Sequence, residues 1–198
     1  AGDAITTGYQ NVLMGINAGG AINTGYNNTC IGYLTGDAIT SGHTNTLIGE
    51  VAGGVISTGT YNNLLGNAAG DAITTGSDNV AMGLHTLGAC TTGGDNVAIG
   101  NYALDALTTV GQLVAVGKHA LGSNTSGTGN NAFGYSAGGA ITTGGNNTLM
   151  GHSAGDATTT GSNNTAFGYN AFGTNVASSE NTAIGSNALA TQNGGSAN

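Results

Sequence analysis

Residues 11–15 read Asn-Val-Leu-Met-Gly, and a variant of this stretch returns every 17 residues along the chain. Its glycine recurs in every unit without insertion or deletion, as Gly15, Gly32, Gly49, Gly66, Gly83, Gly100, Gly117, Gly134, Gly151, Gly168 and Gly185. A strict short period is the mark of a repeat protein in which each unit stacks on its neighbours. The sequence therefore predicts a solenoid of eleven coils over residues 1–187, with a partial twelfth repeat or tail over residues 188–198.

Two short strands are predicted in each unit when its positions are numbered from Ala1 as slots one to seventeen. The first covers slots four to seven, as in residues 72–75, and the second covers slots twelve to fourteen, as in residues 97–99. Both are rich in β-forming residues and bounded by glycine, and no uninterrupted run is long enough for a helix. The predicted fold is all-β: a parallel β-solenoid, or β-roll, with one coil per 17-residue repeat.

Slots thirteen and fourteen are both apolar in every unit. Slot thirteen holds only Ala, Leu or Cys, and slot fourteen holds a large apolar side chain. Adjacent strand residues point to opposite faces, so both faces should be shielded from water. We assign slot fourteen to the core and expect copies of the same chain to cover the opposite face. The predicted core ladder is Met14, Ile31, Ile48, Leu65, Met82, Ile99, Val116, Phe133, Met150, Phe167 and Ile184.

Slot eleven is asparagine in ten of the eleven units, with Leu113 the exception. Stacked coils would place these amides about 4.8 Å apart, where they can hydrogen-bond along the stack. The predicted asparagine ladder is Asn11, Asn28, Asn45, Asn62, Asn79, Asn96, Asn130, Asn147, Asn164 and Asn181. Slot three carries Asp3, Asp37, Asp71 and Asp105 in alternate units, a spacing that like-charge repulsion between neighbouring coils would favour.

Several stretches resemble a known family. Residues 181–188 read Asn-Thr-Ala-Ile-Gly-Ser-Asn-Ala, with close relatives from Asn96 and from Asn164. They resemble the YadA-like head repeats of trimeric autotransporter adhesins, and similar repeats in phage tail fibres. The resemblance implies a left-handed β-roll assembled as a homotrimer, although the adhesin repeat is typically shorter and lacks the Ala-Ile-Thr-Thr-Gly half.

Composition argues against several classes of partner. The formal net charge is −8, and Lys118 is the only basic residue, so no positive surface exists for nucleic acid or anionic lipid. No run approaches the roughly 18 apolar residues of a membrane-spanning helix. Membrane insertion is therefore not expected. The two cysteines, Cys30 and Cys90, replace small apolar residues of other units and are expected to be buried.

No catalytic or metal site is predicted, and no cofactor. The four histidines, His43, His85, His119 and His152, occupy corner slots, and no two lie close enough by spacing to share a metal. No nucleophile, base and acid can be assembled from the repeat positions. The chain is therefore not expected to be an enzyme.

The expected function is that of a structural or adhesive fibre segment, outside the cell, on a cell surface or on a virion. It would form a homotrimer and attach to a host surface, a matrix or a glycan. The alternative is an ice-binding solenoid, because threonine or serine fills most positions of slots six and seven. Flat threonine arrays on β-solenoids are a feature of ice-binding proteins. The column assigned to this alternative includes Thr74, Thr91, Thr108, Thr142 and Thr159.

Overall fold

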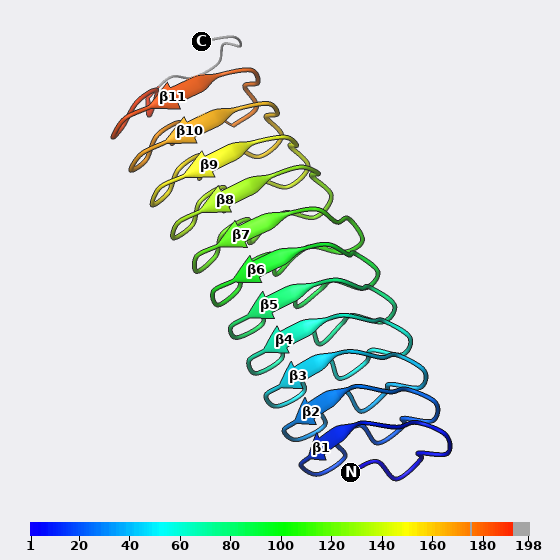
Figure 1. Cartoon of the computed structure of the whole chain (residues 1–198). Coiled ribbons are helices and arrows are strands. Elements are labelled where there is room, and N and C mark those ends of the chain that lie inside the picture. The colour runs from blue at the N-terminus through cyan, green and yellow to red at the C-terminus, as the bar shows by residue number, and fades with distance from the viewer. Residues whose placement is uncertain (175, 192–198) are drawn as a thin grey trace.

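The chain forms a parallel β-solenoid with one strand in each of eleven coils. The structure, a computed structural model, describes residues 1–174 and 176–191, and no helix occurs among them. Figure 1 shows the strands stacked along one side of a rod, with the two termini at opposite ends. The strands are β1 (Val12–Met14), β2 (Thr29–Ile31), β3 (Thr46–Ile48), β4 (Asn63–Leu65), β5 (Val80–Met82), β6 (Val97–Ile99), β7 (Val114–Val116), β8 (Asn131–Phe133), β9 (Thr148–Met150), β10 (Thr165–Phe167) and β11 (Thr182–Ile184).

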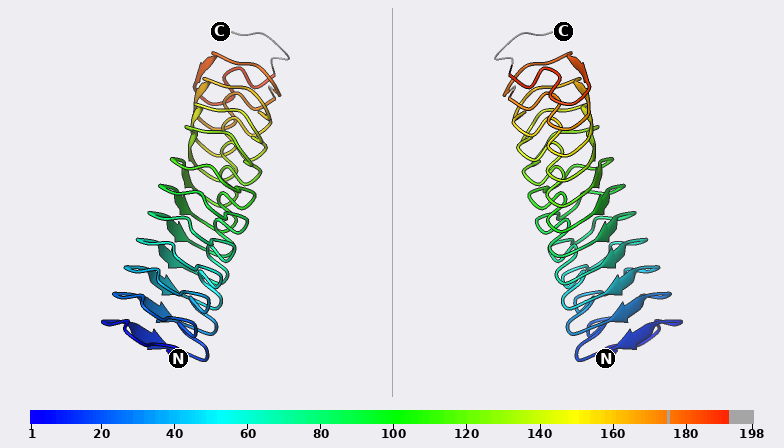
Figure 2. Two further views of the ribbon diagram at one scale, coloured as in Figure 1. Left: turned by 90° about the vertical axis from the view of Figure 1, so that its right-hand side faces the viewer. Right: turned by 90° about the vertical axis from the view of Figure 1, so that its left-hand side faces the viewer.

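Each strand pairs with the same slots of the next coil. Val12 pairs with Thr29 and Met14 with Ile31, and this register is kept from β1 to β11 in one sheet. The two side views in Figure 2 show the strands along one edge of the rod and the remainder of each coil beside them. The prediction of an all-β parallel solenoid with one 17-residue coil per repeat is confirmed. All eleven strands lie within residues 1–187, while residues 192–198 of the expected twelfth repeat or tail fall outside the described part of the chain.

The first predicted strand, slots four to seven, is wrong. These residues form a bend, because successive amides converge on one carbonyl instead of pairing along a ladder. The amide groups of Asn23, Thr24 and Gly25 all donate to the carbonyl oxygen of Thr40, at 3.0, 3.1 and 3.2 Å. Slot five points into the coil at this bend, as in Ile39, which is fully buried.

The invariant glycine of slot fifteen has a steric cause. Gly100 has a φ of +123°, and a Cβ atom there would lie 2.6 Å from the carbonyl carbon of Gly117 in the next coil. Both the left-handed backbone and the close approach exclude a side chain. The coils can therefore stack at strand spacing only with glycine at this slot.

The core contains the slot-five side chain of most coils and, beside it, a second large side chain drawn from slot thirteen or from the following slot two, with Ala132 followed by Gly138 as the exception. Leu64 in slot thirteen is followed by Gly70 in slot two, where a Cβ atom would lie 2.8 Å from Leu64 Cδ1. In another coil slot thirteen holds the small Ala98, which leaves the corresponding volume empty. The following slot two then holds Leu104, whose side chain fills that volume although its backbone φ is +52°. The same exchange places Leu87, Leu121 and Phe172 after Ala81, Ala115 and Ala166. Slot thirteen therefore faces the core.

Candidate functional site

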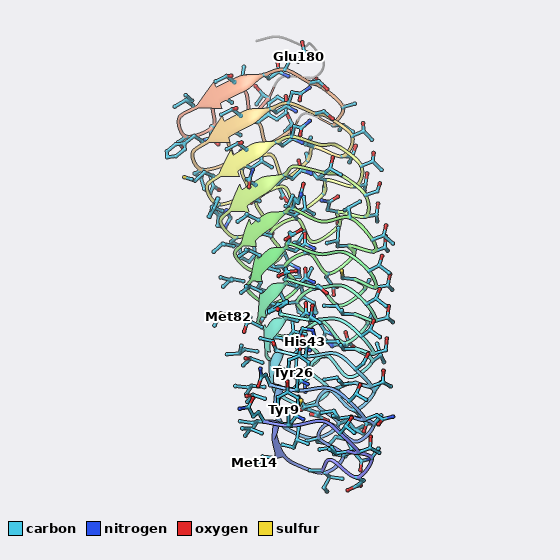
Figure 3. All side chains as sticks on the ribbon, turned by 45° about the vertical axis from the view of Figure 1, so that its right-hand side comes forward. Tyr9, Met14, Tyr26, His43, Met82 and Glu180 are labelled. Carbon is cyan, nitrogen blue, oxygen red and sulfur yellow. The ribbon has the colours of Figure 1, made fainter. Side chains whose placement is uncertain are left out.

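A continuous apolar strip runs along the outside of the sheet, formed by the slot-fourteen side chains. Met14 is 63% exposed, Ile99 36% and Ile184 70%, whereas Ala98 on the other face of β6 is fully buried. Figure 3 shows Met14 and Met82 projecting from the strand side of the rod. The apolar strip comprises Met14, Ile31, Ile48, Leu65, Met82, Ile99, Val116, Phe133, Met150, Phe167 and Ile184.

The assignment of this column to the core is therefore wrong for the single chain. The alternation of slots thirteen and fourteen across the strand is as expected, but the two faces are reversed. Slots thirteen and fourteen alone could not decide which face lies inside, because both columns are apolar. Two signals were present: slot twelve, on the slot-fourteen face, is Thr or Asn in seven of the eleven units, and slot thirteen exchanges size with the following slot two, as side chains in one enclosed volume must.

The slot-eleven asparagines hydrogen-bond to one another along the interior. The Nδ2 group of Asn28 donates to Asn11 Oδ1 at 3.2 Å and to the carbonyl of Gly42 at 2.9 Å, and its backbone amide donates to Asn11 Oδ1 at 3.0 Å. The pattern continues through Asn45, Asn62, Asn79 and Asn96, is interrupted at Leu113, and resumes from Asn130 through Asn147, Asn164 and Asn181. These side-chain amides hydrogen-bond to neighbouring coils of the same chain, so their role is to hold the coils together.

The threonine columns of slots six and seven both lie on the outer surface. In a strand adjacent side chains would point to opposite faces, but these residues are in a bend, so both columns face outward. The slot-six hydroxyls donate to the slot-six carbonyl of the next coil, as from Thr74 to Thr91 at 3.1 Å and from Thr142 to Thr159 at 3.2 Å. Thr91 and Thr159 are half-buried, and Thr108 is exposed. The slot-seven side chains, such as Thr75 and Thr92, are exposed.

A column of six aromatic rings follows one corner of the rod. Its members are His85, Tyr102, His119, Tyr135, His152 and Tyr169, one in each of six consecutive coils. Ring centroids of Tyr102 and His119 are 5.1 Å apart with planes 8° from parallel. Reasoning from the histidines alone missed this ring column. The signal was present, since tyrosines occupy the same two slots in the intervening units.

A second, shorter stack occupies another corner near the N-terminus. Tyr9 stacks on Tyr26 with ring centroids 5.1 Å apart, and Tyr26 stacks on His43 at 4.4 Å. Figure 3 labels these three residues one above another along the rod. Tyr61 meets His43 edge-on at 5.5 Å. Stacked rings of this kind stabilise neighbouring coils and present polar edges to solvent.

Titratable groups beside the ring column are few. Partial burial raises the pKa of Asp71, while nearby His85 lowers it; burial likewise raises the pKa of Asp156, while His152 lowers it. Cys30 and Cys90 are free and buried, and burial raises the pKa of Cys30 to about 12, so its thiol is not ionised at neutral pH. Within residues 1–174 and 176–191, no three His, Cys, Asp or Glu side chains are grouped to hold a metal ion, and no helix could cross a membrane.

Comparisons with models of protein families, with curated proteins and with solved structures find no match. The outer surfaces of the solenoid are therefore the guide to its function.

Proposed function

We propose that the chain is a non-catalytic structural and adhesive fibre segment that works as a homotrimer. The observation that carries this proposal is the apolar strip, in which every coil places one large apolar side chain on the outer face, exposed in eight coils and half-buried at Ile31, Leu65 and Val116. At about 4.8 Å per coil, the strip is on the order of 50 Å long. A contiguous apolar surface of this extent is typical of an interaction site.

Copies of the same chain are the partners that fit the strip best. The strip contains no charged side chain, so identical copies can pack there in spite of the net charge of −8. Parallel rods with the same coil rise would keep their strips in contact along their whole length. Three copies around a common axis would bury all three strips at once, which is the arrangement implied by the resemblance to adhesin head repeats. This packing would supply the shielding of both strand faces that the sequence requires.

The trimer would act as a rigid shaft that presents the variable corners, including the ring column, to the surroundings. The partners that we propose are a host surface, a matrix or a glycan, met outside the cell from a cell surface or a virion. Nucleic acid is a poor partner, because Lys118 is the only basic side chain. We do not propose membrane insertion, because the sequence has few positive charges for anionic lipid and no apolar run long enough for a membrane-spanning helix.

The mass of the particle in solution tests the trimer. We expect light scattering or native mass spectrometry to give three times the chain mass of 19.0 kDa. The mass should stay constant on dilution, since burial of eleven large apolar side chains per chain gives a strong association. A stable monomer would contradict the proposal, and a dimer would contradict its three-fold symmetry.

Ice binding is a second candidate, because the exposed slot-seven threonine column runs along the rod beside the partly exposed slot-six column. If this face binds ice, the chain should show thermal hysteresis, and Thr75→Tyr together with Thr92→Tyr should abolish most of it. The matched control is Thr148→Tyr, an exposed threonine on the strand face. Absence of hysteresis in the unaltered chain, or equal loss in the control, would exclude ice binding by these columns.

A further inference from the structure

A shallow groove opens beside the ring column, between coils six and ten. Its volume is about 370 Å³, and its lining includes two carboxylates, two hydroxyls and two rings, from Asp105, Asp156, Ser123, Ser136, Tyr102 and His119. The groove lies at the corner of the rod and not on the apolar strip. It is therefore a separate surface from the one proposed to join the copies.

The floor of the groove arises from two consecutive glycines in slot three. At several coils an aspartate folds over the glycine of the preceding coil: a Cβ atom on Gly88 would lie 2.6 Å from Asp105 Oδ1, and one on Gly139 would lie 2.7 Å from Asp156 Oδ1. At these coils the alternation of Asp and Gly has a steric cause in addition to charge repulsion, whereas Gly54 has no aspartate among its nearest atoms. Gly122 differs, because the nearest atoms to a Cβ there are backbone carbonyl oxygens at 3.2 and 3.3 Å. Because Gly139 follows Gly122 in the next coil, no slot-three side chain is present in the two coils between Asp105 and Asp156.

The ring column shifts its position at the same place. It changes from slot seventeen at His119 to slot sixteen at Tyr135, and these two rings meet edge-on at 84° with centroids 6.5 Å apart. This is the widest spacing in the ring column, against 5.1 Å between the stacked Tyr102 and His119. Ser136 takes the slot where a stacked ring would otherwise continue. The face of His119 directed at coil eight therefore has no parallel ring over it.

The lining is suited to a ligand rich in hydroxyl groups. The carboxylates of Asp105 and Asp156 accept hydrogen bonds, the hydroxyls of Ser123 and Ser136 both donate and accept, and the ring of His119 offers an apolar face. The two carboxylates stand three coils apart, about 14 Å, so they cannot converge on one small cation. No Lys or Arg side chain lines the groove, which disfavours acidic glycans.

We propose that this groove binds a short uncharged oligosaccharide of two or three sugar units. Its sugar hydroxyls donate to the two carboxylates at the ends and exchange hydrogen bonds with the serines in the middle. A C–H face of one sugar packs against the His119 ring. This inference rests on the proposed attachment function and names the class of ligand for one part of the surface.

Titration calorimetry with maltotriose, cellotriose and tri-N-acetylchitotriose tests the groove. We expect the unaltered chain to bind at least one of them, and the double variant Ser123→Ala with Asp156→Asn to bind it at least about tenfold more weakly. Alanine is the usual residue of slot four, so Ser123→Ala suits the coil. The matched control is Asp37→Asn, which removes a slot-three carboxylate that folds over Gly20 far from the groove. Circular dichroism checks that each variant is folded.

Three results would overturn the assignment. The first is that none of the three sugars binds at 10 mM, on the order of the weakest affinities worth measuring. The second is that the folded groove variant binds the sugar as tightly as the unaltered chain. The third is that only a cationic probe such as tri-lysine binds. The mass of the same sample separates this test from that of the fibre. A monomer that binds sugar through the groove would support the sugar site and contradict the proposed trimer. A trimer that binds no sugar would support the proposed trimer and contradict the sugar site.

Discussion

Replacing Ala98 with aspartate should unfold the solenoid, whereas the same change at the adjacent Ile99 should leave each chain folded and separate the copies. Ala98 is fully buried against the core, next to the large Leu104 side chain of the following coil. A carboxylate there would be enclosed without a partner, and we expect the free energy of unfolding to fall by about 4 kcal/mol or more. Ile99 is 36% exposed in the single chain, so a carboxylate there can remain hydrated.

Melting curves and particle mass, measured together, distinguish the two outcomes. Ala98→Asp should lose the β-sheet signal in circular dichroism, while Ile99→Asp should keep it and fall to the mass of one chain. Thr75→Asp is the control, because it adds the same charge to an exposed column away from the apolar strip. If Ile99→Asp unfolds as fully as Ala98→Asp, the column is not an outer face. If Ile99→Asp stays folded and trimeric, the strip is not the interface.

The period of the sequence was sufficient to predict the solenoid and its strands at slots twelve to fourteen. Slots thirteen and fourteen did not decide the direction of the strand faces, because Ala98 and Ile99 are both apolar. Slot twelve did carry a signal, since it shares the slot-fourteen face and is Thr or Asn in seven of the eleven units. The exchange of side-chain size between slots thirteen and two also carries that information. Large Leu64 is followed by Gly70, whereas small Ala98 is followed by Leu104, because the two slots share one interior volume.

The predicted strand at slots four to seven failed for a different reason. Its Ile-Thr-Thr composition favours strands, yet the amides there converge on single carbonyls, as at Thr40. Intrinsic β-propensity is weak beside the geometry of a closed coil. The ring column and the groove are likewise products of stacking. The sequence aligns His119 with Tyr102 in one slot, but the open space at Gly122 depends on which way Asp105 and Asp156 fold.

The break in the asparagine ladder at Leu113 is compensated one coil later by Asn124, and removing Asn124 should lower stability sharply. In other coils the slot-eight carbonyl accepts from the asparagine of the preceding coil, as Gly144 does from Asn130 at 2.7 Å. The Leu113 side chain has no donor, and the carbonyl of Gly127 instead accepts from Asn124 Nδ2 at 3.0 Å. The amide of Gly127 also donates to Asn124 Oδ1 at 2.8 Å.

Asn124→Ile installs the residue that is usual in slot five but leaves the carbonyl and the amide of Gly127 without these partners. Because this site is buried, we expect the free energy of unfolding to fall by about 3 kcal/mol. Adding Leu113→Asn should restore a donor for the Gly127 carbonyl and an acceptor for the next coil. The double variant should therefore recover about 2 kcal/mol relative to Asn124→Ile, although Leu113→Asn alone should destabilise the chain.

Urea unfolding of the unaltered chain, both single variants and the double variant completes the cycle. All four should be measured at one chain concentration, because association adds to the apparent stability. A coupling energy of more than about 2 kcal/mol in favour of the double variant is the expected result, because the double variant recovers about 2 kcal/mol even though Leu113→Asn alone destabilises the chain. The matched control pairs Leu113→Asn with Ile39→Val, several coils from the break, and should be additive. Additive effects of Leu113→Asn and Asn124→Ile would show that Asn124 does not replace the missing rung.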